Sequence, residues 1–379
     1  MRIENARVFR GGAFESGGID FESVIRAAGA AVTGGLDAEG CRLIPGLVDI
    51  HSHGAAGADA SDGDPEGLER MARCYAAAGV TAWCPTTMTL DEAALVRALC
   101  TVRDYRRPRD GAAVAGVNLE GPFLSREKCG AQDPRKVRAP DIALFRRLNE
   151  ASGGAVRLVT LAPEQPGAAE FIAEACRECT VSLGHTTADY DTARKAFDAG
   201  ASHVTHLFNA MPPLLHRAPG VIAAAFDADA TVELIADGLH VHPSVVRMTR
   251  RLFGDRLALI SDSVRCAGMP DGEYTLGGQP ITLCGGRATL RDTETIAGSA
   301  ITLMEGVRRA VRFGMPVEEA IVSATEVPAR IIGMAGEIGT LEPGARADFV
   351  LLDDALDVRA VFIGGVQIAG EPLCARQEA

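Results

Sequence analysis

Two histidines one residue apart offer the clearest chemistry in this sequence. In His51-Ser52-His53 they follow the apolar run 43–50, which predicts a β-strand. Residues i and i+2 of a strand point to the same side, so both imidazoles can converge on one metal ion.

Further ligand-type side chains stand at the ends of other apolar runs: Glu120, His185, His206 and Asp262. A single such residue is usually a cap or a satisfied core group, but five strand ends that behave alike indicate a shared metal site. Imidazole and carboxylate ligands suit Zn²⁺ or Fe²⁺ better than Mg²⁺. A bound metal lowers the pKa of its water toward ~7, and a nearby Asp can take the proton and return it to a leaving amine. These parts indicate a metal-dependent hydrolase.

The elements that must position these residues alternate along the chain. Predicted strands cover 43–50, 80–85, 114–120, 156–162, 180–185, 203–207, 232–237 and 257–262. Predicted helices between them include 65–78, 91–105, 141–151, 168–178 and 189–199. Eight strand-helix repeats are typical of an α/β fold of the (β/α)8 barrel type, whose active site lies at the carboxyl ends of the strands. Each candidate ligand lies at such an end.

The two ends of the chain have a different pattern. Residues 1–42 and 337–379 contain short strand-like pieces and glycine turns, and neither is long enough for a robust core of its own. We expect them to pair into one small β-sandwich domain beside a barrel domain of residues 43–336.

Composition limits the partners. The net charge of -12 argues against nucleic-acid binding and requires local cations for any anionic substrate. No apolar stretch is long enough to span a bilayer, and the N-terminus lacks the layout of a signal peptide. The ten cysteines are irregularly spaced, so reduced thiols and a cytoplasmic location without membrane contact are expected.

The ordered motifs resemble the amidohydrolase superfamily and, within it, the N-acetylglucosamine-6-phosphate deacetylase family. The resemblance is carried by LVDIHSHG (47–54), LEGPF (119–123), GHT (184–186), THLFNAM (205–211), IADGLH (235–240) and SDS (261–263). It extends to 339–348 and so covers nearly the whole chain. It implies a distorted (β/α)8 barrel, a homodimer, and hydrolysis of the acetamide of N-acetyl-D-glucosamine 6-phosphate to D-glucosamine 6-phosphate and acetate.

The resemblance also implies roles for the candidate ligands. Glu120, His185 and His206 are implied to bind one divalent metal ion, Zn²⁺ or Fe²⁺. The pair His51 and His53 can bind a second ion, with Glu120 as the bridge, so one or two ions per subunit are expected. Asp262 is implied to be the general base and acid.

A second implied set of residues binds the sugar phosphate. Arg side chains form paired hydrogen bonds to phosphate oxygens, and Arg217 is implied to reach the site of the neighbouring subunit. The implied contacts are the backbone of Asn209 and Ala210, the side chains of Arg217 and His240, and the main chain of Ile296, Ala297 and Gly298 beside the sugar.

Three positions near the motifs need separate interpretation. Some family members have a His that polarises the acetyl carbonyl where this chain has Gln132, which can donate a hydrogen bond but carries no charge. Cys129 lies on the same loop and can approach the metal, although a surface cysteine is the more common case. His203 has the wrong spacing for a ligand, so we expect it to pack in the barrel.

Several alternatives stay open at this point. Many cyclic-amide hydrolases resemble one another in using a carboxylated Lys at the end of strand 4, but 156–164 has no Lys, which disfavours them. A non-enzymatic scaffold with this fold would be expected to lose ligands, and this chain keeps them. A related substrate such as N-acetylgalactosamine 6-phosphate needs only a local change in the pocket.

Overall fold

Eight parallel strands form a nearly closed barrel in the computed structural model, which describes residues 1–374. The strands follow one another around it in chain order: β6 (Leu47–Ser52), β9 (Val80–Thr87), β11 (Val117–Glu120), β12 (Val156–Leu161), β13 (Thr180–Leu183), β14 (His203–Val204), β15 (Thr231–Ile235) and β16 (Leu257–Ile260). A parallel bridge between Ser52 and Ser263 brings the last strand back toward the first. The predicted (β/α)8 barrel is confirmed.

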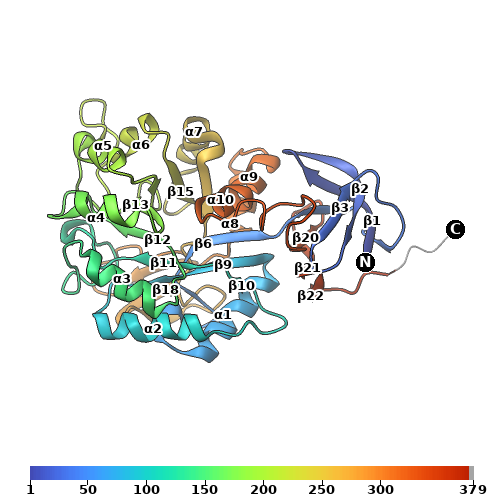
Figure 1. Cartoon of the computed structure of the whole chain (residues 1–379), viewed down its shortest axis with the longest axis horizontal. Coiled ribbons are helices and arrows are strands. Elements are labelled where there is room, and N and C mark those ends of the chain that lie inside the picture. The colour runs from blue at the N-terminus through green and yellow to red at the C-terminus, as the bar shows by residue number, and fades with distance from the viewer. Residues whose placement is uncertain (375–379) are drawn as a thin grey trace.

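Helices follow most of the barrel strands and surround them (Figure 1). They are α1 (Pro65–Ala77), α2 (Glu92–Asp104), α3 (Ile142–Ala151), α4 (Ala168–Ala175), α5 (Tyr190–Asp198), α6 (Gly220–Asp227), α7 (Pro243–Phe253), α8 (Leu303–Arg312), α9 (Val317–Ala324) and α10 (Glu326–Ile331). Aspartates cap the N-termini of four of them, since Asp64, Asp91, Asp141 and Asp189 accept hydrogen bonds from first-turn N–H groups. The five predicted helices lie within three residues of observed ones.

A second sheet combines both ends of the chain. It contains β1 (Arg2–Arg10), β2 (Ala13–Phe21), β3 (Ile25–Gly29), β4 (Leu36–Asp37), β5 (Arg42–Pro45), β20 (Phe349–Leu352), β21 (Val358–Ile363) and β22 (Val366–Gly370). Figure 1 shows it at one side of the barrel, where blue and red segments meet. Phe21, Phe349 and Phe362 pack ring against ring in its core. The domain boundaries proposed from the sequence stay a prediction.

The single strand predicted for 43–50 is in fact two strands. β5 pairs with β20 in the terminal sheet, whereas β6 pairs with β9 in the barrel. Gly46 separates them, and a Cβ there would stand 2.1 Å from Thr81 Oγ1. An apolar run buried on both sides therefore changes sheets at a glycine without any break in its hydrophobic pattern.

A small antiparallel sheet follows the last barrel strand and was not predicted. It is formed by β17 (Gly272–Leu276), β18 (Gln279–Cys284) and β19 (Arg287–Leu290). Gln279 Nε2 donates to the carbonyl of Ala131 at 2.5 Å, which joins this sheet to the loop that carries Gln132. Two short strands, β7 (Gly54–Ala55) and β8 (Ala58–Asp59), follow β6, and β10 (Ala113–Val114) pairs beside β9. In residues 1–374 no helix combines the length and apolar character needed to cross a membrane.

Candidate metal centre and substrate pocket

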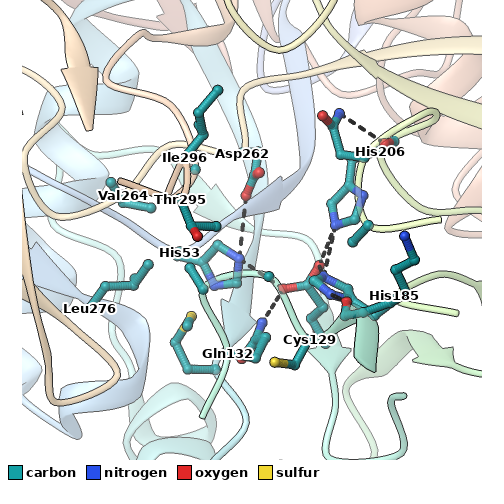
Figure 2. A pocket seen from close by; sticks show the side chains of 18 of the residues that line it. His53, Cys129, Gln132, His185, His206, Asp262, Val264, Leu276, Thr295 and Ile296 are labelled. Carbon is teal, nitrogen blue, oxygen red and sulfur yellow. Dashed lines mark hydrogen bonds and ion pairs between the residues drawn. The ribbon is translucent and has the colours of Figure 1, made fainter. Parts of the chain in front are cut away.

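A carboxylate and two imidazoles meet at the carboxyl ends of the barrel strands. Glu120 is the last residue of β11, and its Oε1 lies 3.1 Å from His185 Nε2 and 2.9 Å from His206 Nε2. The two Nε2 atoms are 3.0 Å apart. Figure 2 shows His185 and His206 side by side in the pocket. This arrangement is the first triad.

The second triad uses the same carboxylate. His53 Nε2 lies 3.2 Å from Glu120 Oε2, and His51 Nε2 lies 3.4 Å from Oε1. Both histidines therefore face the same way, as the i, i+2 spacing predicts. Glu120 belongs to both triads and can bridge two ions.

The donor atoms fit a divalent metal ion. In each triad the ligand atoms lie within 4.8 Å of one another, and all five side chains are buried. Two imidazole nitrogens and a carboxylate oxygen converge at the first triad. A cation between them can accept the lone pairs of all three atoms, so no proton is needed to separate them. His185 Nδ1 donates to the carbonyl of Lys128 at 2.8 Å, which leaves Nε2 free to bind metal. The geometry therefore fits a site for a divalent metal ion.

Charges in the metal-free centre are strongly coupled. Burial opposes the protonation of His53, but hydrogen bonds to Asp262 and Glu120 outweigh it and raise the pKa of His53 to about 9. For His51, burial is likewise outweighed by Glu233 and Glu120, and the pKa is raised. Burial alone would raise the pKa of Glu120, yet His51 and His185 hold it well below its usual value. Metal binding at these ligands therefore competes with the binding of protons.

Asp262 stands beside both histidines of the second triad. It follows β16, and its Oδ1 lies 3.4 Å from His53 Nε2 and 3.6 Å from His51 Nε2. Burial opposes ionisation of Asp262, but the hydrogen bond to His53 and the charge of His51 lower its pKa. An ionised carboxylate in this place can accept a proton from a water molecule in the centre.

Three residues of the metal centre have a left-handed backbone, which is uncommon for side chains with a Cβ. The φ angles are +47° at His185, +26° at His206 and +46° at Asp262. Each costs on the order of 1–3 kcal/mol and persists where surrounding structure enforces it. The turns immediately after the strands therefore carry strain at the residues that face the centre.

A cavity of about 520 Å³ opens over the centre, and most of the predicted substrate residues line it. These lining residues are Gln132, Asn209, Ala210, His240, Ile296 and Gly298, whereas Ala297 is buried beside them. His240 Nδ1 lies 2.7 Å from Asp237 Oδ2, so one ring nitrogen is held and the other is left for a ligand.

Arg217 does not line this cavity. It borders a separate cavity of about 510 Å³ together with Tyr190 and Pro212. Its nearest polar contact is His216 Nε2 at 2.6 Å. Leu214 and Leu215 beside it are 41% and 53% exposed, which is high for leucine.

Gln132 is already hydrogen-bonded at both ends of its amide. Nε2 donates to Glu120 Oε2 at 2.5 Å, and Oε1 accepts from the N–H of Thr89 at 2.6 Å. Cys129 lines the cavity, and burial raises the pKa of its thiol. A neutral thiol at this place is a weak metal ligand.

The sequence reasoning missed Glu233, a buried carboxylate that contacts two of the candidate ligand residues. Glu233 Oε2 lies 2.8 Å from His51 Nδ1 and accepts the backbone N–H of His206 at 3.0 Å. His203, expected to pack only, contacts its other oxygen at 3.2 Å. A signal was present, since Glu233 is a charged residue inside the apolar run 232–237.

We expect the affinity for Zn²⁺ at the second triad, to which His53 belongs, to fall as the pH is lowered from about 9.5 to 7.5. His53, with its pKa raised to about 9, must lose a proton before it can bind, and a histidine of ordinary pKa ~6.5 gives almost no change in that range. The same pKa shift affects the stability of the metal-free fold. The proton on His53 contributes its full stabilisation below pH ~6.5, and this stabilisation is lost as the pH rises through about 9.

Calorimetric titration with metal-buffered Zn²⁺ measures this dependence, with His53→Asn as the comparison. The variant should show a shallower slope. Equal slopes for the two proteins would contradict the assignment of the shifted proton to His53.

Comparison with known proteins places the chain in a family. The amidohydrolase family model matches residues 42–368. N-acetylgalactosamine-6-phosphate deacetylase of Escherichia coli O157:H7 is 39% identical over 85% of this chain and 86% of its own. N-acetylglucosamine-6-phosphate deacetylase of Bacillus subtilis (strain 168) is 38% identical over 83% and 82%. The Mycobacterium smegmatis N-acetyl-D-glucosamine-6-phosphate deacetylase, solved with N-acetyl-D-glucosamine 6-phosphate, has a TM-score of 0.92 at 36% identity over 97% and 99% of the two chains. The chain belongs to the amidohydrolase family.

Proposed function

We propose that this chain is an enzyme that hydrolyses the acetamide of N-acetyl-D-glucosamine 6-phosphate to D-glucosamine 6-phosphate and acetate. The observation that carries the proposal is the buried double triad around Glu120, with Asp262 beside it at the base of one cavity. Relatives named for this activity, 34–38% identical over most of the chain, support the substrate. A non-enzymatic scaffold has no need for such a centre.

The metal site supplies an acidified water and a polarised acetamide carbonyl when it is loaded. Glu120, His185 and His206 would hold one divalent ion, and His51 and His53, together with Glu120, would hold a second. Asp262 accepts one proton of the attacking water and gives it to the sugar nitrogen as the C–N bond breaks, so that the amine leaves uncharged. The other proton of that water stays on the new carboxyl group and is released to solvent when acetic acid ionises to acetate. We assign Zn²⁺, with Fe²⁺ as the alternative, because imidazole and carboxylate ligands suit both ions.

The remaining pocket residues are assigned to the substrate. His240, oriented by Asp237, and the backbone of Asn209 and Ala210 bind the 6-phosphate, and 296–298 flanks the sugar. Gln132 orients the acetamide once its amide exchanges its bond to Glu120 for one to the substrate. The support for this assignment is a shared cavity, which is lined by Gln132, Asn209, Ala210, His240, Ile296 and Gly298.

We assign Arg217 to the phosphate site of a partner subunit in a homodimer. Arg217 lies outside the substrate cavity of its own chain, and the exposed Leu214 and Leu215 beside it are suited to a subunit contact.

The ten cysteines are free, which is typical of the reducing cytoplasm where we place the enzyme.

Acetate release from a panel of N-acetylated amino sugars tests the function. We expect turnover of N-acetylglucosamine 6-phosphate to exceed that of N-acetylgalactosamine 6-phosphate and of both unphosphorylated sugars, and to be lost after chelation and restored by Zn²⁺. A preference for the galactosamine substrate would support the second candidate, which one relative carries in its name. No acetate from any sugar would contradict the function.

Asp262→Asn should lower kcat by ~10²–10⁴-fold because the amide keeps the shape of the side chain but cannot take a proton. Metal content and substrate affinity should remain close to those of the native protein. Steady-state kinetics together with elemental analysis measure both properties. A variant with near-native kcat would remove Asp262 from the mechanism.

Arg217→Ala should raise KM for the phosphorylated sugar by about tenfold or more and leave the slow hydrolysis of the unphosphorylated sugar unchanged. Mixed dimers of Arg217→Ala and Asp262→Asn subunits should regain activity, because one of their sites has both residues intact. Absence of rescue in purified mixed dimers would place Arg217 outside the partner's site.

A further inference from the structure

Glu233 is a buried carboxylate behind the metal centre that belongs to neither triad. It lies on β15 with no exposed surface, and the His51 ring stands between it and Glu120. His51 Nδ1 faces Glu233 Oε2 at 2.8 Å, whereas His51 Nε2 faces Glu120 Oε1 at 3.4 Å. Glu233 therefore contacts the side of the ring that is opposite to the metal position.

Both carboxylate oxygens of Glu233 are committed. Oε2 accepts from His51 Nδ1 and from the backbone N–H of His206 at 3.0 Å. Oε1 faces His203 Nε2 at 3.2 Å, and His203 Nδ1 in turn faces Thr231 Oγ1 at 2.7 Å. A buried carboxylate is costly unless such donors surround it, so this group is held in a single orientation.

The other histidines of the triads are held differently. The Nδ1 of His185 is bound by a backbone carbonyl, that of Lys128. The Nδ1 atoms of His53 and His206 have no hydrogen-bond partner among residues 1–374. Of the four ligand histidines, His51 is the one whose ring is backed by a carboxylate.

We propose that Glu233 is a positioning residue for the second metal position. By accepting the Nδ1–H of His51 it selects the tautomer whose Nε2 lone pair faces Glu120, and it strengthens that nitrogen as a ligand. The same oxygen accepts the backbone N–H of His206, so Glu233 also fixes the position of His51 relative to His206, one histidine of each triad. It contacts the ring of His51 but only the main chain of His206, and therefore the second position depends on it more than the first.

This inference rests on the two-ion form of the proposed function but not on the identity of the substrate. Its test uses two variants of the full chain. Glu233→Gln keeps an acceptor oxygen that can take the place of Oε2 but removes the charge. Glu233→Leu removes both acceptors.

Asp237→Asn is the matched control. Asp237 and His240 form another buried carboxylate-imidazole pair, at 2.7 Å, at the same end of the barrel, but His240 belongs to neither triad. Apo-protein of all four forms is titrated with Co²⁺ and followed by calorimetry and by visible absorption. Circular dichroism checks the fold, and acetate release is measured separately on the native protein.

The native protein is expected to bind two ions per subunit. Glu233→Leu should weaken the second ion by about 10–100-fold, Glu233→Gln should weaken it less, and the first ion should change by less than about threefold in both. Asp237→Asn should bind both ions like the native protein. If Glu233→Leu does not fold, the glutamine variant decides alone, with a loss of about fivefold or more confined to the second ion as the supporting result.

Several results overturn the inference: a native protein that binds a single ion, unchanged affinity for the second ion in the Glu233 variants, equal losses for both ions, or the same loss in Asp237→Asn. None of these bears on the substrate. Failure of the native protein to release acetate instead contradicts the proposed function, whatever the titrations show.

Discussion

The shared carboxylate of Glu120 is the interaction on which the arrangement of the site depends. One buried anion faces four imidazoles. They are His51 on β6, His53 just after β6, and His185 and His206 in the turns after β13 and β14. An anion this deep is costly unless cations or donors surround it, so those chain segments must bring their nitrogens to it. The barrel makes this possible because parallel strands end at one face. Closure of the barrel and assembly of the centre are thus parts of one requirement.

The strain in the turns follows from the same requirement. A strand that ended in ordinary extended geometry would carry its next side chain along the barrel axis. At His185, His206 and Asp262 the backbone enters the left-handed region instead, which turns each side chain toward the centre. The cost, on the order of 1–3 kcal/mol each, is offset by the apolar barrel core beneath them. Rigid strands hold the ends still, and the strained turns aim the ligands.

Much of this site could be predicted because strand ends are local features. The apolar runs, the period of two and the ligand at each end were sufficient for six residues that the structure brings together: His51, His53, Glu120, His185, His206 and Asp262. What escaped prediction depends on long-range packing. Glu233 appeared as one charge in a buried strand, and its partners His51 and His203 come from other strands. The change of sheet at Gly46 leaves the hydrophobic pattern unbroken, and the sheet β17–β19 carries no ligand that would draw attention to it.

Charge balance explains why an acidic chain can receive a dianionic sugar phosphate. Among the described residues that line the cavity, Lys128 supplies the only Lys or Arg side chain, whereas Glu120, Glu127 and Asp262 supply negative charge. An anionic substrate would be repelled by such a surface. A divalent ion bound at Glu120 would offset the net negative charge of these side chains, so the same ion that serves the chemistry would also let the substrate enter. The phosphate, at the far end of the sugar, needs positive groups of its own, and we assign to it His240, a lining imidazole that belongs to neither triad. We assign a further positive group to Arg217 of a partner subunit, since Arg217 borders a separate cavity and lies beside the exposed Leu214 and Leu215.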